Sequence, residues 1–129
     1  MKKKKLLSLG PLLLSSLLLA GCTTTITNLT PSTQKRNPNG LYPVEVALDT
    51  REYCIRKETL KPYVLVGSRI YPMQPTLMLK DRWETLVPVP ANMEYVNYRF
   101  KFNYDLRSIP EPTPSSKLSR PFQLQILDK

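Results

Sequence analysis

The residue with the most distinctive chemistry in this sequence is Cys22, because its thiol is a nucleophile and follows an unusual N-terminal segment. Lysines fill positions 2–5, and an apolar run over residues 6–19 leads through two small residues to the cysteine. A basic start, a short apolar middle and a small-residue exit are typical of a secretory signal peptide. The run is shorter than the about 20 residues that a membrane-spanning helix needs, and Gly10-Pro11 interrupts it. We therefore expect residues 1–21 to be a signal peptide.

The sequence Leu19-Ala20-Gly21-Cys22 resembles the lipobox of bacterial lipoproteins at all four positions. The resemblance implies that Cys22 carries a thioether-linked diacylglycerol, that the Gly21–Cys22 bond is cleaved and that the new amino group is acylated. It also implies an exported protein anchored to a bacterial membrane, the outer membrane being favoured over the inner one. Whether such a protein faces the periplasm or the cell surface stays open. An ordinary signal peptide that happens to meet a cysteine is the alternative.

The chain after residue 21 offers little for catalysis. It has no histidine, and therefore lacks the commonest general base at neutral pH and the commonest metal ligand. Glu45 and Asp49 lie four residues apart on a predicted strand, about 13 Å at about 3.3 Å per residue, whereas glycosidase carboxylate pairs lie about 5–9.5 Å apart. Ser68 has no histidine to activate it. We predict a protein that is not an enzyme and binds no cofactor or metal.

One cysteine remains once Cys22 is lipidated, namely Cys54. A single cysteine allows neither an intramolecular disulfide nor a cysteine-rich metal site. In an oxidising compartment an odd thiol can pair between chains, which makes a dimer link one interpretation. The interpretation we favour is a half-buried, unpaired residue between Tyr53 and Ile55.

The net charge of the chain after residue 21 indicates which kinds of partner to expect. Removal of residues 1–21 leaves 108 of the 129 residues, enough for one small domain. The formal net charge of +9 falls to an excess of five, because the signal carries four of the 19 basic residues and none of the ten acidic ones. A moderately basic surface favours anionic surfaces such as headgroups or acidic glycans. Residues 98–102 alternate aromatic and basic side chains, which puts the aromatics and the charges on opposite faces, so we expect no nucleic-acid binding.

Alternation of apolar and polar residues predicts strands through most of the chain. A hairpin is predicted over residues 61–73, with Gly67-Ser68 as a type II′ turn. Residues 22–40 are predicted to be a lipidated tether, with a first strand near residues 24–30 as the alternative. The other predicted strands cover residues 42–48, 76–79, 83–89, 96–106 and 122–126.

About seven short strands without a helical period predict an all-β, antiparallel immunoglobulin-like β-sandwich over residues 41–129. The pattern resembles immunoglobulin-like and fibronectin type III-like domains, but it lacks the inter-sheet cystine, and Trp83 stands late in the chain. It also resembles small uncharacterised bacterial lipoproteins with an immunoglobulin-like body, through residues 71–73, 79–84 and 88–90. That resemblance implies a fold and a location and no activity.

Loops of such domains usually carry their function. The proline- and serine-rich segment 107–121 is predicted to be a long loop with a restricted backbone, which loses less entropy on docking than a glycine-rich loop. The residues predicted to contact a partner are Ile109, Pro110, Pro112 and Pro114; a plain connector is the alternative. A second candidate is the region of Tyr71–Met73 and Trp83, although core packing is favoured for Trp83.

These observations together predict a lipid-anchored cell-envelope protein. We expect a non-catalytic scaffolding, adhesion or assembly accessory module that acts through protein–protein contacts with an envelope partner. The alternative is a module that binds an envelope glycan or an anionic surface with the basic outer faces of its sheets. The identity of the partner or ligand does not follow from the sequence.

Overall fold

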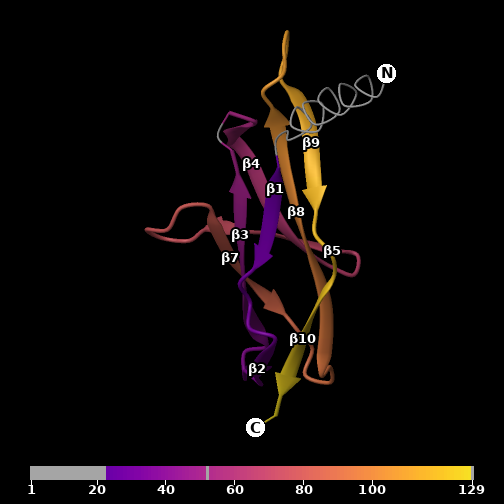
Figure 1. Ribbon diagram of the computed structural model, residues 1–129. Helices are drawn as coiled ribbons and strands as arrows, with labels where there is room; N and C mark the ends of the chain where they lie inside the picture. Colours follow the sequence, from indigo (N-terminus) through magenta and orange to yellow (C-terminus); the bar gives the residue numbers. More distant parts are fainter. Residues whose placement is uncertain (1–22, 52, 129) are drawn as a thin grey trace, which may run out of the picture.

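The computed structural model describes residues 23–51 and 53–128, which form two β-sheets stacked along an elongated molecule (Figure 1). No helix in these two ranges is long and apolar enough to cross a membrane. The strands in chain order are β1 (Thr24–Asn28), β2 (Thr33–Lys35), β3 (Leu41–Thr50), β4 (Ile55–Val66), β5 (Arg69–Pro72), β6 (Gln74–Pro75), β7 (Arg82–Pro88), β8 (Tyr95–Leu106), β9 (Thr113–Leu118) and β10 (Phe122–Leu127).

The two sheets have four and six strands. The first has the order β1-β3-β7-β6, and the second has the order β2-β10-β8-β4-β5, with β9 also paired to β8. All of these pairs are antiparallel except β2 with β10, which is parallel. The chain changes sheets several times, and one of these changes is at Met73, between β5, which pairs with β4, and β6, which pairs with β7. The described residues thus form the predicted antiparallel immunoglobulin-like β-sandwich.

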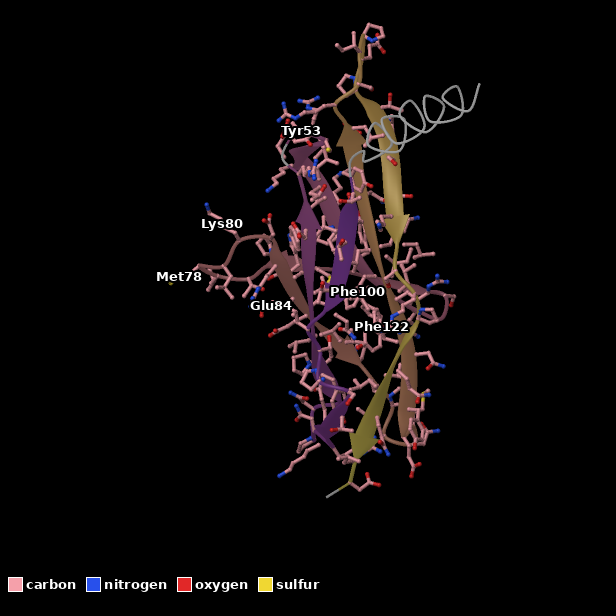
Figure 2. The ribbon with its side chains drawn as sticks, viewed as in Figure 1. Tyr53, Met78, Lys80, Glu84, Phe100 and Phe122 are labelled. Carbon is pink, nitrogen blue, oxygen red and sulfur yellow. The ribbon has the colours of Figure 1, made fainter. Side chains whose placement is uncertain are left out.

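The core lies between the sheets and follows the predicted alternation. On β3, the inward side chains of Tyr42, Val44, Val46 and Leu48 are at most 2% exposed. On β8, five alternate side chains from Val96 to Tyr104 are buried, and Phe100 and Phe102 are fully enclosed. Figure 2 shows Phe100 and Phe122 in the middle of the molecule, with ring centroids 5.8 Å apart. Each such burial contributes about 1.5–3 kcal/mol to folding.

The predicted hairpin is present between β4 and β5. Val66 pairs with Arg69, so Gly67 and Ser68 form a two-residue turn. Gly67 has a φ of 58°, whereas Ser68 is not among the residues with positive φ. One positive φ at the first turn position is the type II′ geometry, because a type I′ turn needs positive φ at both positions.

The N-terminal part of the described chain belongs to the sheets. Residues 24–28 form β1, which pairs with β3 over five residues, as the first-strand alternative requires. Residues 33–35 form β2, which the sequence did not predict, and pair with the last strand. Arg36 adds an ion pair with Asp128 at 2.9 Å. β1 and β2 are therefore edge strands of the two sheets, and the residues between them connect the sheets.

Two other predictions are wrong: a predicted strand is a loop, and part of a predicted loop is a strand. Residues 76–79 were predicted to be a short strand, but they lie in the connection between β6 and β7 and have no strand partner. Residues 113–118 were predicted to be part of a loop, but they form β9 along β8. With β2, β6 and β9, the described residues contain ten strands against the predicted seven or so. The additional strands are short and lie at sheet edges, where burial imposes little alternation.

Cys54 also differs from expectation. It is 6% exposed, and it is disulfide-bonded in this structure. The expected half-buried, unpaired cysteine is therefore not what the structure has.

Candidate functional site

The predicted partner-binding segment divides into a short loop and a strand. Ile109, Pro110 and Pro112 lie together in the loop between β8 and β9, whereas Pro114 lies in β9, where it pairs with Asp105. All four are exposed, and Ile109 is 98% exposed. The peptide bond between Ile109 and Pro110 is cis. Figure 1 shows this loop at the end of the molecule where β1 begins.

The same loop is tied together by its own polar groups. The hydroxyl of Ser108 donates a hydrogen bond to the carbonyl of Glu111 at 2.5 Å, and it lies 2.6 Å from the hydroxyl of Thr113. Ile109 therefore stands at the apex of a closed turn and does not belong to a long extended segment. As one isolated exposed apolar residue it is a normal feature of a protein surface.

The predicted lipidation and cleavage residues, Cys22 and Gly21, lie outside the described residues. The first described strand begins two residues after Cys22, at Thr24. The backbone carbonyl of Thr24 accepts a hydrogen bond from the Lys117 ammonium on β9, which joins the edges of the two sheets at this point.

The second predicted candidate, around Tyr71–Met73 and Trp83, is mainly a packing site. Trp83 is half-buried, and its ring meets the fully buried Phe102 edge-on, with centroids 5.5 Å apart and an interplanar angle of 71°. Met73 is 7% exposed and belongs to the core. A hollow of about 250 Å³ remains between Trp83 and the prolines Pro62, Pro72 and Pro75. Core packing thus accounts for most of this region, as predicted for Trp83.

A surface that the sequence prediction missed is the connection between β6 and β7, residues 76–81, which we name the apolar loop. Leu77 is 87% exposed, Met78 is 101% exposed and Leu79 is 50% exposed. Figure 2 shows Met78 and Lys80 at the tip of this loop, far from the body of the sandwich. The three consecutive apolar residues Leu77-Met78-Leu79 are the sequence signal that could have revealed it, since a half-buried strand alternates.

The base of the apolar loop is fastened to the sandwich. The amide of Thr76 donates to the carbonyl of Arg82 at 2.9 Å, and the amide of Leu48 on β3 donates to the carbonyl of Asp81 at 3.0 Å. The Asp81 carboxylate also forms an ion pair with Lys57 at 3.3 Å. Met78 and Asp81 have φ values of 63° and 58°, a region that costs a non-glycine residue about 1–2 kcal/mol. The backbone is thus held in a specific shape that presents its apolar side chains to solvent.

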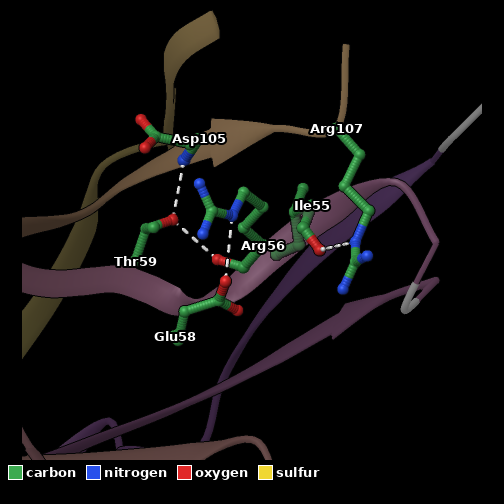
Figure 3. A network of polar contacts seen from close by, with 6 residues as sticks. All are labelled: Ile55, Arg56, Glu58, Thr59, Asp105 and Arg107. Atoms are coloured by element: carbon green, nitrogen blue, oxygen red, sulfur yellow. Dashed lines mark hydrogen bonds and ion pairs between the residues drawn. The ribbon is translucent and has the colours of Figure 1, made fainter. Parts of the chain in front are cut away.

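A second unpredicted surface begins at a bulge in β4. Lys57 to Leu60 lie between the paired residues Arg56 and Lys61, whereas only Tyr104 lies between their partners on β8. Figure 3 shows how Thr59 bridges this irregularity. Its hydroxyl donates to the carbonyl of Arg56 at 2.6 Å and accepts from the amide of Asp105 at 2.9 Å. One side chain therefore satisfies two backbone groups that the interrupted ladder leaves over.

The bulge borders a hollow of about 750 Å³ on the outer face of the six-stranded sheet, which we name the polar hollow. Its lining comes from β4, β8 and β9, and most of the lining residues have a polar group in the side chain, among them Thr59, Lys61, Tyr63, Asn103, Asp105 and Ser116. Lys61 pairs with Asn103, and Asn103 pairs with Ser116, so these three side chains share one face across three strands.

Charges near the bulge are paired at the surface. Glu58 has its pKa lowered, first by a hydrogen bond from its own backbone and then by the Arg56 guanidinium, 2.9 Å from the carboxylate. Both side chains are exposed, so this pair orders the bulge locally and contributes little to overall stability. In the described part of the chain, no three side chains of the metal-binding types come together.

Comparisons with known proteins give a distant structural likeness. No protein-family model and no curated protein matches the chain. Among solved structures, it is similar to AggA, the major subunit of aggregative adherence fimbriae type I from Escherichia coli, with 12% sequence identity and a TM-score of 0.46. The match covers 82% of this chain and 95% of that chain. A likeness at this level carries no statement about function.

Proposed function

We propose that this protein is a lipid-anchored cell-envelope protein that acts as a non-catalytic scaffolding, adhesion or assembly module through protein–protein contacts. The observation that carries the contact part of the proposal is the apolar loop. The anchor part rests on the lipobox-like sequence that ends at Cys22.

The apolar loop has the properties expected of a docking element. Its three apolar side chains contribute nothing to the core, because each is at least half exposed. Its backbone is nevertheless fixed by bonds to Arg82 and Leu48 and by the ion pair of Asp81. A prearranged apolar element loses little conformational entropy when a partner covers it. Covering Leu77 and Met78 in an apolar pocket would contribute about 1.5–3 kcal/mol for each side chain.

The test is photo-crosslinking in living cells, with a photoreactive amino acid at position 78. We expect an adduct with one envelope protein in stoichiometric yield, because the tip of the loop would lie inside the interface. The matched control places the same amino acid at Ile70, which is 63% exposed on β5 and lies outside the loop.

A substitution adds a second condition to this test. Leu77→Ser should abolish the adduct from position 78 while leaving the fold intact, because an exposed side chain contributes within about 0.5 kcal/mol to stability. If position 78 gives no more adduct than position 70, or if Leu77→Ser leaves the adduct unchanged, the loop is not the contact surface and the proposal fails.

A second candidate function is favoured by one separate observation. The alternative predicted from the sequence was binding of an envelope glycan or an anionic surface. The polar hollow offers such a ligand a concave surface with several polar side chains, on the outer face of the six-stranded sheet.

A further inference from the structure

We propose that the polar hollow is a binding site for an acidic oligosaccharide. This inference deepens the second candidate function by naming its site and ligand class, and it is independent of a protein contact at the apolar loop. Either can be true without the other.

The first argument is the unused hydrogen-bonding capacity of the hollow. Within the described residues, the side chains of Lys61, Tyr63, Asn103 and Asp105 make no hydrogen bond or ion pair with the rest of the protein. They offer an ammonium donor, a phenol, an amide that both donates and accepts, and a carboxylate acceptor. Sugar hydroxyls both donate and accept, so a mixed set of this kind suits them.

The second argument is the aromatic ring at the wall. Tyr63 is half-buried on the outer face of β4, opposite Lys101 of β8, and it takes part in none of the ring–ring contacts among the described residues. A tyrosine offers a flat apolar surface with a polar rim. A sugar ring presents C–H groups on its face and hydroxyls at its edge, which matches that arrangement. The hollow, about 750 Å³, lies within the range of about 300–1,000 Å³ of small-molecule sites.

The third argument is charge. Lys61 and Asp105 are the charged residues that line the hollow. The next outward positions of β8 add Lys101, which is opposite Tyr63, and Arg99, whereas Glu58 in the bulge is already paired with Arg56. Arg99 is held in place, since its Nε donates to the carbonyl of Ser119 at 2.9 Å. An excess of cations on one face attracts an anionic ligand and favours it over a neutral one. The ligand class is therefore an oligosaccharide that carries carboxylates, and not a neutral sugar.

The experiment is calorimetric titration of the full-length protein, purified as the cell makes it, with a trisaccharide of hexuronic acid. The neutral trisaccharide of the corresponding hexose serves as the matched ligand. We expect the acidic trisaccharide to bind about tenfold more tightly than the neutral one. Its affinity should fall when the salt rises from about 0.1 M to about 1 M, because the screening length shortens from about 10 Å to about 3 Å.

Substitutions in the polar hollow test whether the acidic trisaccharide binds there. Tyr63→Ala and Asn103→Ala should each weaken the affinity by about tenfold, and circular dichroism verifies that they fold. Tyr53→Ala is the matched control, because Tyr53 is a 64% exposed tyrosine in the turn before β4 and lies outside the hollow. Asn103→Ala keeps the site testable if Tyr63→Ala fails to fold.

Several results would overturn the proposal. These are the absence of saturable binding, unchanged affinity in both hollow variants, or equal binding of the neutral trisaccharide. Displacement by inorganic phosphate at constant ionic strength would show a general anion site and would overturn the sugar assignment. None of these results bears on the crosslinking test at position 78, so the two proposals fail separately.

Discussion

Thr59 shows how one hydroxyl group replaces a missing part of a β-ladder. The bulge in β4 separates the backbone of this strand from β8. The Thr59 hydroxyl accepts a hydrogen bond from the amide of Asp105 and donates one to the carbonyl of Arg56. A half-buried backbone group without a partner costs more than the bond itself contributes, because the group loses its water. A serine or a threonine at this position therefore preserves the bulge and the part of the polar hollow that this residue lines.

The prediction at this scale concerns stability. Thr59→Ala should lower the free energy of unfolding by about 1–2 kcal/mol, because two backbone groups lose their partner. Thr59→Ser should stay close to the original protein, since it keeps the hydroxyl. Urea denaturation monitored by circular dichroism measures the difference. Equal unfolding midpoints for the alanine and serine variants would contradict the role given to the hydroxyl.

At the scale of strands, β7 and β8 are joined across the core by one edge-on aromatic contact. Trp83 covers Phe102, which has no exposed surface. The ring of Trp83 is half-buried, so it closes the side of the sandwich where the chain crosses from β5 to β6.

Removal of this closure should be costly. Trp83→Ala should destabilise the protein by about 2–3 kcal/mol, somewhat less than the about 3–5 kcal/mol of a fully buried aromatic residue. Trp83→Phe, which keeps an aromatic ring, should recover most of that loss. Because Trp83 is the sole tryptophan of the chain, circular dichroism and not fluorescence must follow the urea unfolding of both variants. Identical losses in the two variants would show that the ring contact contributes nothing.

The strands also explain which parts of the fold follow from the sequence. β3, β8 and β10 bury one face, and a strand with one buried face must alternate, so their residues were identifiable from the pattern. β9 lies at an edge and most of its side chains are exposed, so its prolines and serines read as a loop. Pro114 is tolerated there because an edge strand need not donate on both sides. The apolar loop had the composition of a strand, but no neighbouring strand pairs with it.

The polar hollow could not be predicted for a different reason. Its walls come from Tyr63 on β4, Asn103 on β8 and Ser116 on β9, and their proximity depends on the register of three strands. Alternation specifies which face a residue occupies, whereas it leaves open which residue lies opposite. The bulge at residues 57–60 also shifts the register of β4. These four residues include no glycine, proline or asparagine from which an irregularity could be predicted.

For the whole molecule, the lipid-anchor proposal depends on a single residue. The chain contains two cysteines, and the lipid-anchor proposal assigns the diacylglycerol to Cys22.

The prediction is that Cys22→Ala releases the protein from the membrane fraction or blocks its processing. One acyl chain binds membranes only marginally, whereas two or more give stable anchoring, so loss of the lipidated cysteine should be decisive. Cys54→Ser is the matched control and should remain membrane-bound. Mass spectrometry of the intact protein measures the mass that the lipid adds. Membrane retention of Cys22→Ala at the original level, or an intact protein without acyl mass, would contradict the anchor.

The parallel pairing of β2 with β10 has a consequence for the order of folding. Residues 33–35 lie beside residues 125–127, so two segments from opposite ends of the chain must meet. Contacts so distant in sequence form late, because the entropy of closing a long loop opposes them until the intervening strands are in place. During synthesis β2 is made early and acquires its partner only after the final strand has emerged. Until β10 pairs, the part of the β8 edge that it will cover is exposed and can pair with other chains. Formation of β10 covers this edge and ends the stage at which the chain is most prone to aggregate.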